Sequence, residues 1–366
     1  MQYYLTLFLL TTSSLLFFPL MKRKKTFLAC LRFFSRESFR TSSAFQYGMF
    51  LAKNKNITDT VYSIFMEFLP STCTYQDEAM IIDFRVRPPI ESYLRSGAFE
   101  VWENPNSPYR NQWEGRIKTP SMDGDMDLFV KEMTDAGIDI SVIIGRMTKV
   151  HDKGRGNVTA DDLLSIMKKY PGRFAGMPAV DPLASDAMEQ IERAAAMGMV
   201  GICIEPFWSS EPLFLNDSRL FPLYKKIESL GLLFTTTLNF NCGESTKWNS
   251  PYHVEQIAMA CPAMPILITH ACWPLLTELM AIAVRYPNIY LIPDCYFYFP
   301  FINTAKEQRI MYNHMLQDQV LFGSSYPIRG FGQAVELSLE QGQWLPGPKE
   351  KFFWKNGAKL LHLQIS

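Results

Sequence analysis

Arginine and histidine side chains stand at the ends of short apolar runs, where they could bind an anion and move a proton. Arg85 and Arg87 close one such run, and Arg146 closes another. A guanidinium presents its N–H groups in a fork that matches a carboxylate or a phosphate. His270 is the one histidine of five that ends an apolar run, and an ordinary pKa of about 6.5 suits it to acid/base catalysis. We therefore expect a small anionic ligand and His270 as the proton carrier.

Two carboxylates, Glu205 and Asp294, end further apolar runs. Either of them could orient His270, activate a water molecule or simply neutralise the arginines. Pairs of the last kind shift pKa values without doing chemistry. We expect one of the two carboxylates to assist His270.

Aromatic residues follow several of the same runs, at Phe207–Trp208, Trp273 and Tyr296–Phe299. They could wall a pocket for a planar substrate, or they could pack beneath a neighbouring loop. Trp273 is the aromatic residue that we expect to contact the substrate.

The elements that position these residues alternate short apolar runs with longer helical stretches. Candidate strands are 81–86, 140–145, 174–180, 200–205, 232–238, 265–270, 288–293 and 320–324. Candidate helices are 125–136, 160–170, 185–197, 219–230, 254–260, 275–286, 304–316 and 349–361. This alternation predicts parallel strands joined by right-handed helical crossovers, and eight of them close a (β/α)8 barrel. Gly198 and Gly231 stand where a helix should stop before the next strand.

The first candidate strand carries charge on one face. Because side chains alternate along a strand, Asp83, Arg85 and Arg87 are predicted to share one face and the alternate apolar residues the other. The irregular link 91–124 follows this strand, so it should lie over the C-terminal mouth of the barrel, where it would serve as a lid or a dimer contact.

Three segments carry a family resemblance: Met80–Pro89, Ile268–Pro274 and Leu321–Pro327. They look like the first, sixth and eighth strands of the amidohydrolase-related family (amidohydrolase 2), which includes aminocarboxymuconate semialdehyde decarboxylase. The resemblance covers about residues 80–363 and implies a TIM (β/α)8 barrel of the metal-dependent hydrolase type, with a non-barrel N-terminal extension. It also implies that His270, which matches the family's histidine on the sixth strand, acts in acid/base chemistry.

The family's metal ligands are replaced in this sequence. Its first-strand His-x-His is Arg85 and Arg87, its metal-binding aspartate is Ser325, and the end of the fifth strand offers only hydroxyls and an amide. Arginine keeps its proton and has no lone pair for a cation, whereas zinc needs about three ligands of the His, Cys or carboxylate type. Only Glu205 and His270 remain as candidates on distinct strands, so we expect no metal and no other cofactor. Ser325 joins the arginines as a substrate-binding residue.

The leading hypothesis is a metal-independent hydrolase of C–O or C–N bonds, or a carbon–carbon lyase, acting on a small carboxylated substrate. The related pyrone dicarboxylate lactonases are understood to hydrolyse without a metal. The alternative is a catalytically silent barrel that binds an anionic ligand or serves as a structural subunit.

The composition of the chain indicates which classes of binding partner and which compartment to expect. Lys+Arg and Asp+Glu both total 36, so the net charge does not favour nucleic acid or an anionic membrane. Seven scattered cysteines without a C-x-x-C pair indicate free thiols in a reducing compartment, and hence a cytoplasmic protein. The composition is compatible with a homo-oligomer.

Residues 1–79 are predicted to form an extension outside a barrel that occupies 80–366. Residues 1–21 are apolar and uncharged, and Lys22–Lys25 follow them, an order that does not fit a secretory signal. One interpretation is a leader or a misassigned start, with translation beginning at Met80. Another is a membrane anchor that holds the barrel on the cytoplasmic side, and a third is a folded accessory element.

Overall fold

The computed structural model describes residues 80–99, 117–149, 156–240, 242–299, 302 and 304–363. The described residues all belong to one compact unit, Ala79–Ser366. The predictions for residues 1–79 and for the middle of the link 91–124 lie outside the described residues. Within the described ranges, no helix is both long enough and apolar enough to cross a membrane.

The strands form two parallel sheets, of order β1-β2-β3 and β4-β5-β6-β7, in the described part of the chain. Their bounds are β1 Ile82–Val86, β2 Ile140–Ile144, β3 Phe174–Met177, β4 Gly201–Cys203, β5 Leu233–Thr237, β6 Ile266–Thr269 and β7 Ile289–Ile292. A bridge between Ala179 and Cys203 joins the sheets on one side.

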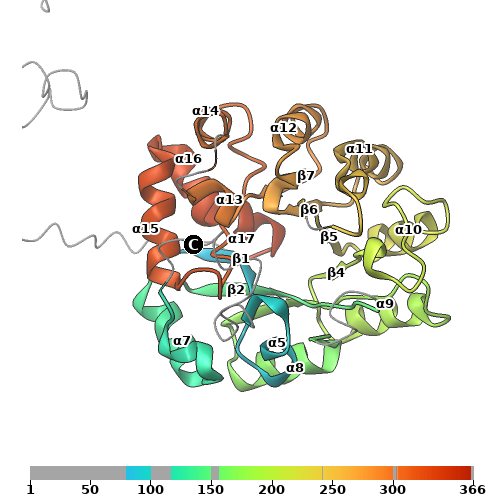
Figure 1. Ribbon diagram of the computed structural model, residues 1–366, viewed down its shortest axis with the longest axis horizontal. Helices are drawn as coiled ribbons and strands as arrows, with labels where there is room; N and C mark the ends of the chain where they lie inside the picture. Colours follow the sequence, from blue (N-terminus) through green and yellow to red (C-terminus); the bar gives the residue numbers. More distant parts are fainter. Residues whose placement is uncertain are drawn as a thin grey trace, which may run out of the picture. The chain divides into compact units, whose positions relative to one another are not determined.

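The segment 320–326 closes the barrel on the other side, between β7 and β1 (Figure 1). Leu321 donates its backbone N–H to the Leu291 carbonyl at 2.9 Å, and Phe84 donates to the Phe322 carbonyl at 2.8 Å. The predicted eighth strand is therefore present as a bridged segment, and the prediction of a (β/α)8 barrel is confirmed.

Helices surround the strands (Figure 1). They are α5 Glu91–Leu94, η3 Pro120–Asp123, α7 Met126–Asp135, α8 Ala160–Lys169, α9 Ala187–Ala196, η5 Pro206–Trp208, α10 Phe221–Ser229, η6 Thr246–Asn249, α11 Pro251–Ala260, η7 His270–Cys272, α12 Leu276–Arg285, α13 Cys295–Tyr298, α14 Ala305–Asn313, α15 Phe331–Gly342, α16 Pro346–Glu350, the π-helical η8 Lys351–Lys355 and α17 Asn356–Leu360. The predicted helices are confirmed to within a few residues. Gly198 and Gly231 end their helices with φ of 78° and 66°.

Helix α15 was not predicted from the sequence. Its first turn contains Gly332, and Pro327 and Gly330 precede it. These residues indicate a turn when only local sequence is considered. Phe331 stacks on Tyr326 with ring centroids 4.8 Å apart, so packing against the barrel fixes the start of this helix.

The barrel interior is filled by one cluster of buried side chains drawn from all eight strand positions. Its strand members include Ile82, Phe84, Val142, Ile144, Met177, Cys203, Leu233, Leu267, Ile292 and Leu321. A second cluster lies between the strands and the helices and includes Val86, Ile143, Ile202, Phe234, Ile268 and Phe322.

Strand β1 departs from the predicted alternation. Ile82 and Phe84 pack in the interior, whereas Val86 packs in the helix layer, and the register with β2 shifts between Asp83 and Val86. A bulge adds one residue to a strand and re-aims the side chains beyond it. The prediction that the apolar residues of β1 share one face was therefore wrong, because the bulge reverses the alternation near the mouth.

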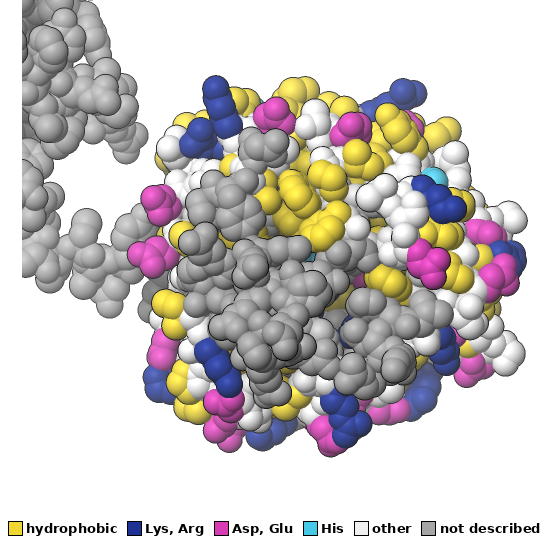
Figure 2. Space-filling model, viewed as in Figure 1, with side chains coloured by type: hydrophobic (Ala, Val, Ile, Leu, Met, Phe, Trp, Pro, Cys, Tyr) yellow, Lys and Arg dark blue, Asp and Glu magenta, His cyan; other side chains and the backbone are white. Residues whose placement is uncertain are grey.

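Surface charge is mixed. On the face shown in Figure 2, Lys/Arg and Asp/Glu side chains are interspersed around the rim of the described part. Cys203, Cys242, Cys261, Cys272 and Cys295 are buried free thiols, as predicted for those positions.

Candidate active site

The predicted proton carrier and one predicted carboxylate meet at the C-terminal ends of β6 and β7. His270 Nδ1 lies 2.9 Å from Asp294 Oδ1 and 2.8 Å from Oδ2. His270 is 6% exposed and Asp294 2%. Because Nδ1 faces a carboxylate, we assign the ring hydrogen to Nδ1, which leaves the Nε2 lone pair as the proton acceptor.

The backbone is strained at three neighbouring strand ends, two of which carry this pair. His270 has φ 62°, Asp294 φ 44° and Ser325 φ 57°, all in the left-handed region that non-glycine residues rarely adopt. Such strain persists where the surrounding packing fixes it, and it gathers at functional sites.

The His270 imidazole is held neutral. Burial is the main cause that lowers its pKa below the ordinary value, and the positive charges of Arg85 and Arg87 lower it further. Asp294 opposes them through its charge and its hydrogen bond. At neutral pH, His270 is therefore a base rather than an acid.

Arg85 crosses the barrel from β1 toward β5. It is 6% exposed, and its Nη2 donates to Thr237 Oγ1 at 3.4 Å. Its Nε is buried without a hydrogen-bond partner in the described structure. Arg87 donates from Nη1 to the Tyr326 carbonyl at 3.5 Å.

Neither arginine pairs with a carboxylate in the part of the chain that the structure describes. Among the described residues, no ion pair within 4.0 Å involves Arg85 or Arg87. Burial, followed by the charge of Arg85, lowers the pKa of Arg87 to about 9, so Arg87 is still protonated at neutral pH. Buried cations are usually paired, and a pair without an anion indicates a place for one.

Glu205 does not reach the histidine. It is half-buried just before η5, and its side chain forms no hydrogen bond or ion pair with His270 or with the strand-end arginines among the described residues. Between the two carboxylates that the sequence left open, the geometry selects Asp294 as the partner of His270.

The other predicted site residues lie around the same mouth. Arg146 follows β2 and forms an antiparallel bridge with Val158. Ser325 is fully buried, and its Oγ has no hydrogen-bond partner among the described residues.

Aromatic rings adjoin the histidine. Trp273 stacks on Tyr296, with centroids 5.2 Å apart and planes 14° apart. Tyr296 meets the His270 ring edge-on at 5.2 Å, and Phe240 meets Trp273 edge-on at 5.5 Å. These rings can wall a planar ligand beside Nε2.

Two residues of this region were given no role in the sequence analysis. Asp83, which was predicted only to share a face with the arginines, is fully buried and accepts a hydrogen bond from the Arg85 backbone N–H at 2.9 Å, and burial raises its pKa to about 7. Thr237 accepts the hydrogen bond from Arg85. The alternation of Thr235 and Thr237 in β5 could have indicated hydroxyls facing the interior, but a lone hydroxyl carries little information about chemistry.

The donor atoms do not fit a zinc hydrolase. His270, Asp294 and Cys295 place one ligand atom each within 4.8 Å of one another. However, His270 Nδ1 is used by Asp294, and burial raises the pKa of the Cys295 thiol well above its ordinary value. The charges of Arg85 and Arg87 act on His270 and would repel a divalent cation.

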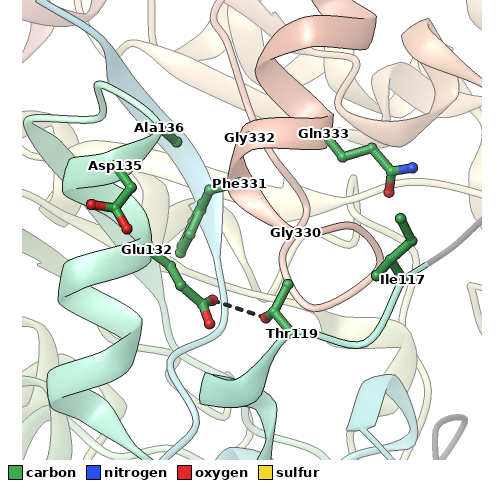
Figure 3. A pocket seen from close by; sticks show the side chains of 9 residues that line it. All are labelled: Ile117, Thr119, Glu132, Asp135, Ala136, Gly330, Phe331, Gly332 and Gln333. Carbon is green, nitrogen blue, oxygen red and sulfur yellow. Dashed lines mark hydrogen bonds between the residues drawn. The ribbon is translucent and has the colours of Figure 1, made fainter.

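A separate hollow of about 280 Å³ lies between the segment 117–119 that precedes η3, the C-terminal half of α7 and the start of α15 (Figure 3). Its lining residues are Ile117, Thr119, Glu132, Asp135, Ala136, Gly330, Phe331, Gly332 and Gln333. Glu132 already accepts hydrogen bonds from Thr119 and Ser121. None of the predicted site residues lines this hollow.

Comparison with known proteins supports the architecture. A family model described as amidohydrolase matches residues 82–363. An uncharacterized TIM-barrel protein from Bordetella bronchiseptica is 28% identical with a TM-score of 0.70, covering 77% of this chain and 98% of that chain. No curated protein matches the chain.

Two more distant structures share the fold. A probable 2-pyrone-4,6-dicarboxylic acid hydrolase from Acinetobacter baumannii, with citric acid bound, is 13% identical with a TM-score of 0.54 and covers 77% of this chain and 99% of that chain. A dihydroxybenzoic acid decarboxylase from Polaromonas sp. JS666, with manganese and the inhibitor 2-nitroresorcinol bound, is 16% identical with a TM-score of 0.56 and covers 79% and 98%.

Proposed function

Because the chain belongs to the amidohydrolase family, we propose that it is a hydrolase or lyase that acts on a small carboxylated substrate without a metal ion. Arg85 and Arg87 bind the substrate carboxylate, and His270 moves the proton with Asp294 as its partner. The observation that carries this proposal is a pair of guanidinium groups without a carboxylate partner among the described residues, close enough to a buried His–Asp pair for their charges to lower the pKa of His270.

Neutral His270 favours hydrolysis over cleavage of a carbon–carbon bond. Nε2 takes a proton from water while the water oxygen forms a bond to the substrate's carbonyl carbon. The same nitrogen then returns the proton to the leaving oxygen or nitrogen as that bond breaks. Asp294 stabilises the imidazolium formed between the two steps, and the guanidinium charge stabilises the developing oxyanion.

The distant relatives support the substrate class. One is named as a hydrolase of a pyrone dicarboxylic acid and holds citric acid, and the other is named as a decarboxylase of dihydroxybenzoic acid. Both names describe carboxylated molecules. The aromatic rings of Trp273 and Tyr296 favour a planar substrate here.

The silent-barrel alternative expects carboxylates of the chain to neutralise the strand-end arginines. In the described structure Arg85 and Arg87 form no such ion pair, so the proposal of an enzyme explains the site better. Inactivity of the purified protein toward every carboxylated ester, lactone and amide tested would favour the alternative.

The experiment is a calorimetric screen of small carboxylates, benzoate among them, followed by turnover assays on the corresponding esters, lactones and amides. We expect saturable benzoate binding that Arg85→Ala abolishes. Arg193→Ala is the matched control, because Arg193 is 63% exposed and pairs with Asp161 on the surface. Activity that disappears with a chelator and returns with zinc would refute the metal-independent mechanism.

A further inference from the structure

Thr237 occupies a central place beside the anion site. It is the last residue of β5, and its Cα partner across the sheet is Thr269 of β6. Thr269 is fully buried, whereas Thr237 is partly exposed. Of this pair, Thr237 is therefore the hydroxyl that a ligand in the barrel mouth can reach.

The hydroxyl of Thr237 accepts two hydrogen bonds. Arg85 Nη2 donates to its Oγ1 at 3.4 Å, and Thr269 Oγ1 donates to it at 3.1 Å. A hydroxyl oxygen has two lone pairs and one hydrogen. With both lone pairs in use, the hydrogen of Thr237 is left as a donor, and no hydrogen bond from it to an acceptor is present among the described residues.

The hydrogen of Thr269 has a second acceptor within reach, the Thr236 carbonyl at 3.4 Å. If Thr269 turned to that carbonyl, Thr237 could donate to Thr269 instead. An anion beside Arg85 favours the first arrangement, because a hydrogen bond to a charged acceptor is about twice as strong as one between neutral groups.

We propose that Thr237 is a ligand-binding residue whose hydroxyl, held by Arg85 and Thr269, donates its own hydrogen to the carboxylate that Arg85 binds. This inference rests on the proposed anion site. It assigns the bound carboxylate a neutral donor from β5 in addition to the guanidinium from β1. Two donors from opposite sides of the barrel would fix the orientation of the carboxylate and not only its position.

The test compares benzoate affinity by calorimetry in the full-length protein and its variants. Thr237→Val keeps the shape and removes the hydroxyl, and we expect it to weaken binding about tenfold, the effect of one lost hydrogen bond to a charged group. Thr237→Ser restores the hydroxyl and should bind within about twofold of the wild type.

Thr236→Val is the matched control. Thr236 is the neighbouring residue, its Oγ1 is buried without a partner, and its loss should leave benzoate affinity unchanged. Thermal unfolding of each variant checks that the fold is intact.

The outcomes separate this inference from the proposed function. If Arg85→Ala abolishes binding while Thr237→Val binds as the wild type does, the role of Thr237 is wrong and the anion site stands. If Arg85→Ala binds normally, or if the wild type does not bind benzoate, both fail. Weakening by Thr237→Ser equal to that by Thr237→Val also overturns the donor role, since the serine retains the hydroxyl.

Discussion

Asp83 should destabilise the folded protein at neutral and alkaline pH. Its side chain is fully buried, its Oδ1 accepts hydrogen bonds from the backbone N–H groups of Arg85 and Ser324 at 2.9 Å each, and its Oδ2 has no partner in the described structure. Burial is the main cause that raises its pKa from 3.8 to about 7. The folded state therefore favours the neutral carboxyl.

The size of the effect follows from linkage. Between the unfolded pKa of 3.8 and the folded pKa of about 7, the folded protein binds more protons than the unfolded chain, so stability falls as pH rises through this window. At 1.36 kcal/mol per pKa unit, the full cost above the window is roughly 4 kcal/mol. Below pH 3.8 the cost is absent.

Asp83→Asn removes the charge and keeps the Oδ1 acceptor for both backbone donors. The amide nitrogen takes the place of Oδ2 and is itself without a hydrogen-bond partner. The gain in the free energy of unfolding should therefore be smaller than the full cost, about 1–3 kcal/mol at pH 8. Urea unfolding at pH 5 and pH 8 measures the difference between the variant and the wild type, which should grow with pH.

Asp135→Asn is the control, because Asp135 is 59% exposed and its loss should change stability little at either pH. A stability difference for Asp83→Asn that is the same at both pH values, or a variant less stable than the wild type at pH 8, would refute the reasoning.

Three further predictions concern the site directly. His270→Ala should lower the turnover rate by about two to four orders of magnitude with a smaller change in affinity, and steady-state kinetics check this; normal turnover would remove His270 from the mechanism. The turnover rate should fall at acid pH with an apparent pKa below the ordinary imidazole value, because burial and the arginines lower the pKa of His270. Asp294→Asn should move this apparent pKa lower still, because Asp294 raises the pKa of His270. An apparent pKa that is unchanged in the variant would contradict the assignment. Gly323→Ala should destabilise the fold by about 1–3 kcal/mol and weaken substrate binding, because the new Cβ would lie 2.9 Å from Arg85 Cβ and 3.3 Å from Asp294 Cβ. Thermal unfolding and turnover assays measure both effects. A variant as stable and active as the wild type would show that β1 and β7 can move apart.

The sequence by itself determined the barrel and the types of residue that stand at its mouth. Strand and helix periodicities are local, so they predicted the seven observed strands and the bridged eighth segment, and the parallel arrangement placed their C-terminal ends together. Residue type at those ends then predicted guanidinium groups and a histidine around one mouth. Neither inference needs any detail of side-chain contact, because a parallel barrel gathers residues that are far apart in the chain. The barrel is confirmed, and the roles of the residues at its mouth stay a prediction.

Tertiary structure decided which of these residues touch. Whether Asp294 or Glu205 serves His270 depends on rotamers and on the left-handed backbone at the ends of β6 and β7, which no periodicity records. The bulge in β1 re-aims the strand beyond Asp83, and Thr237 is recruited only because β5 lies across the barrel from β1. Distances of a few ångströms between residues more than a hundred positions apart follow from register and packing, and those are properties of the folded chain.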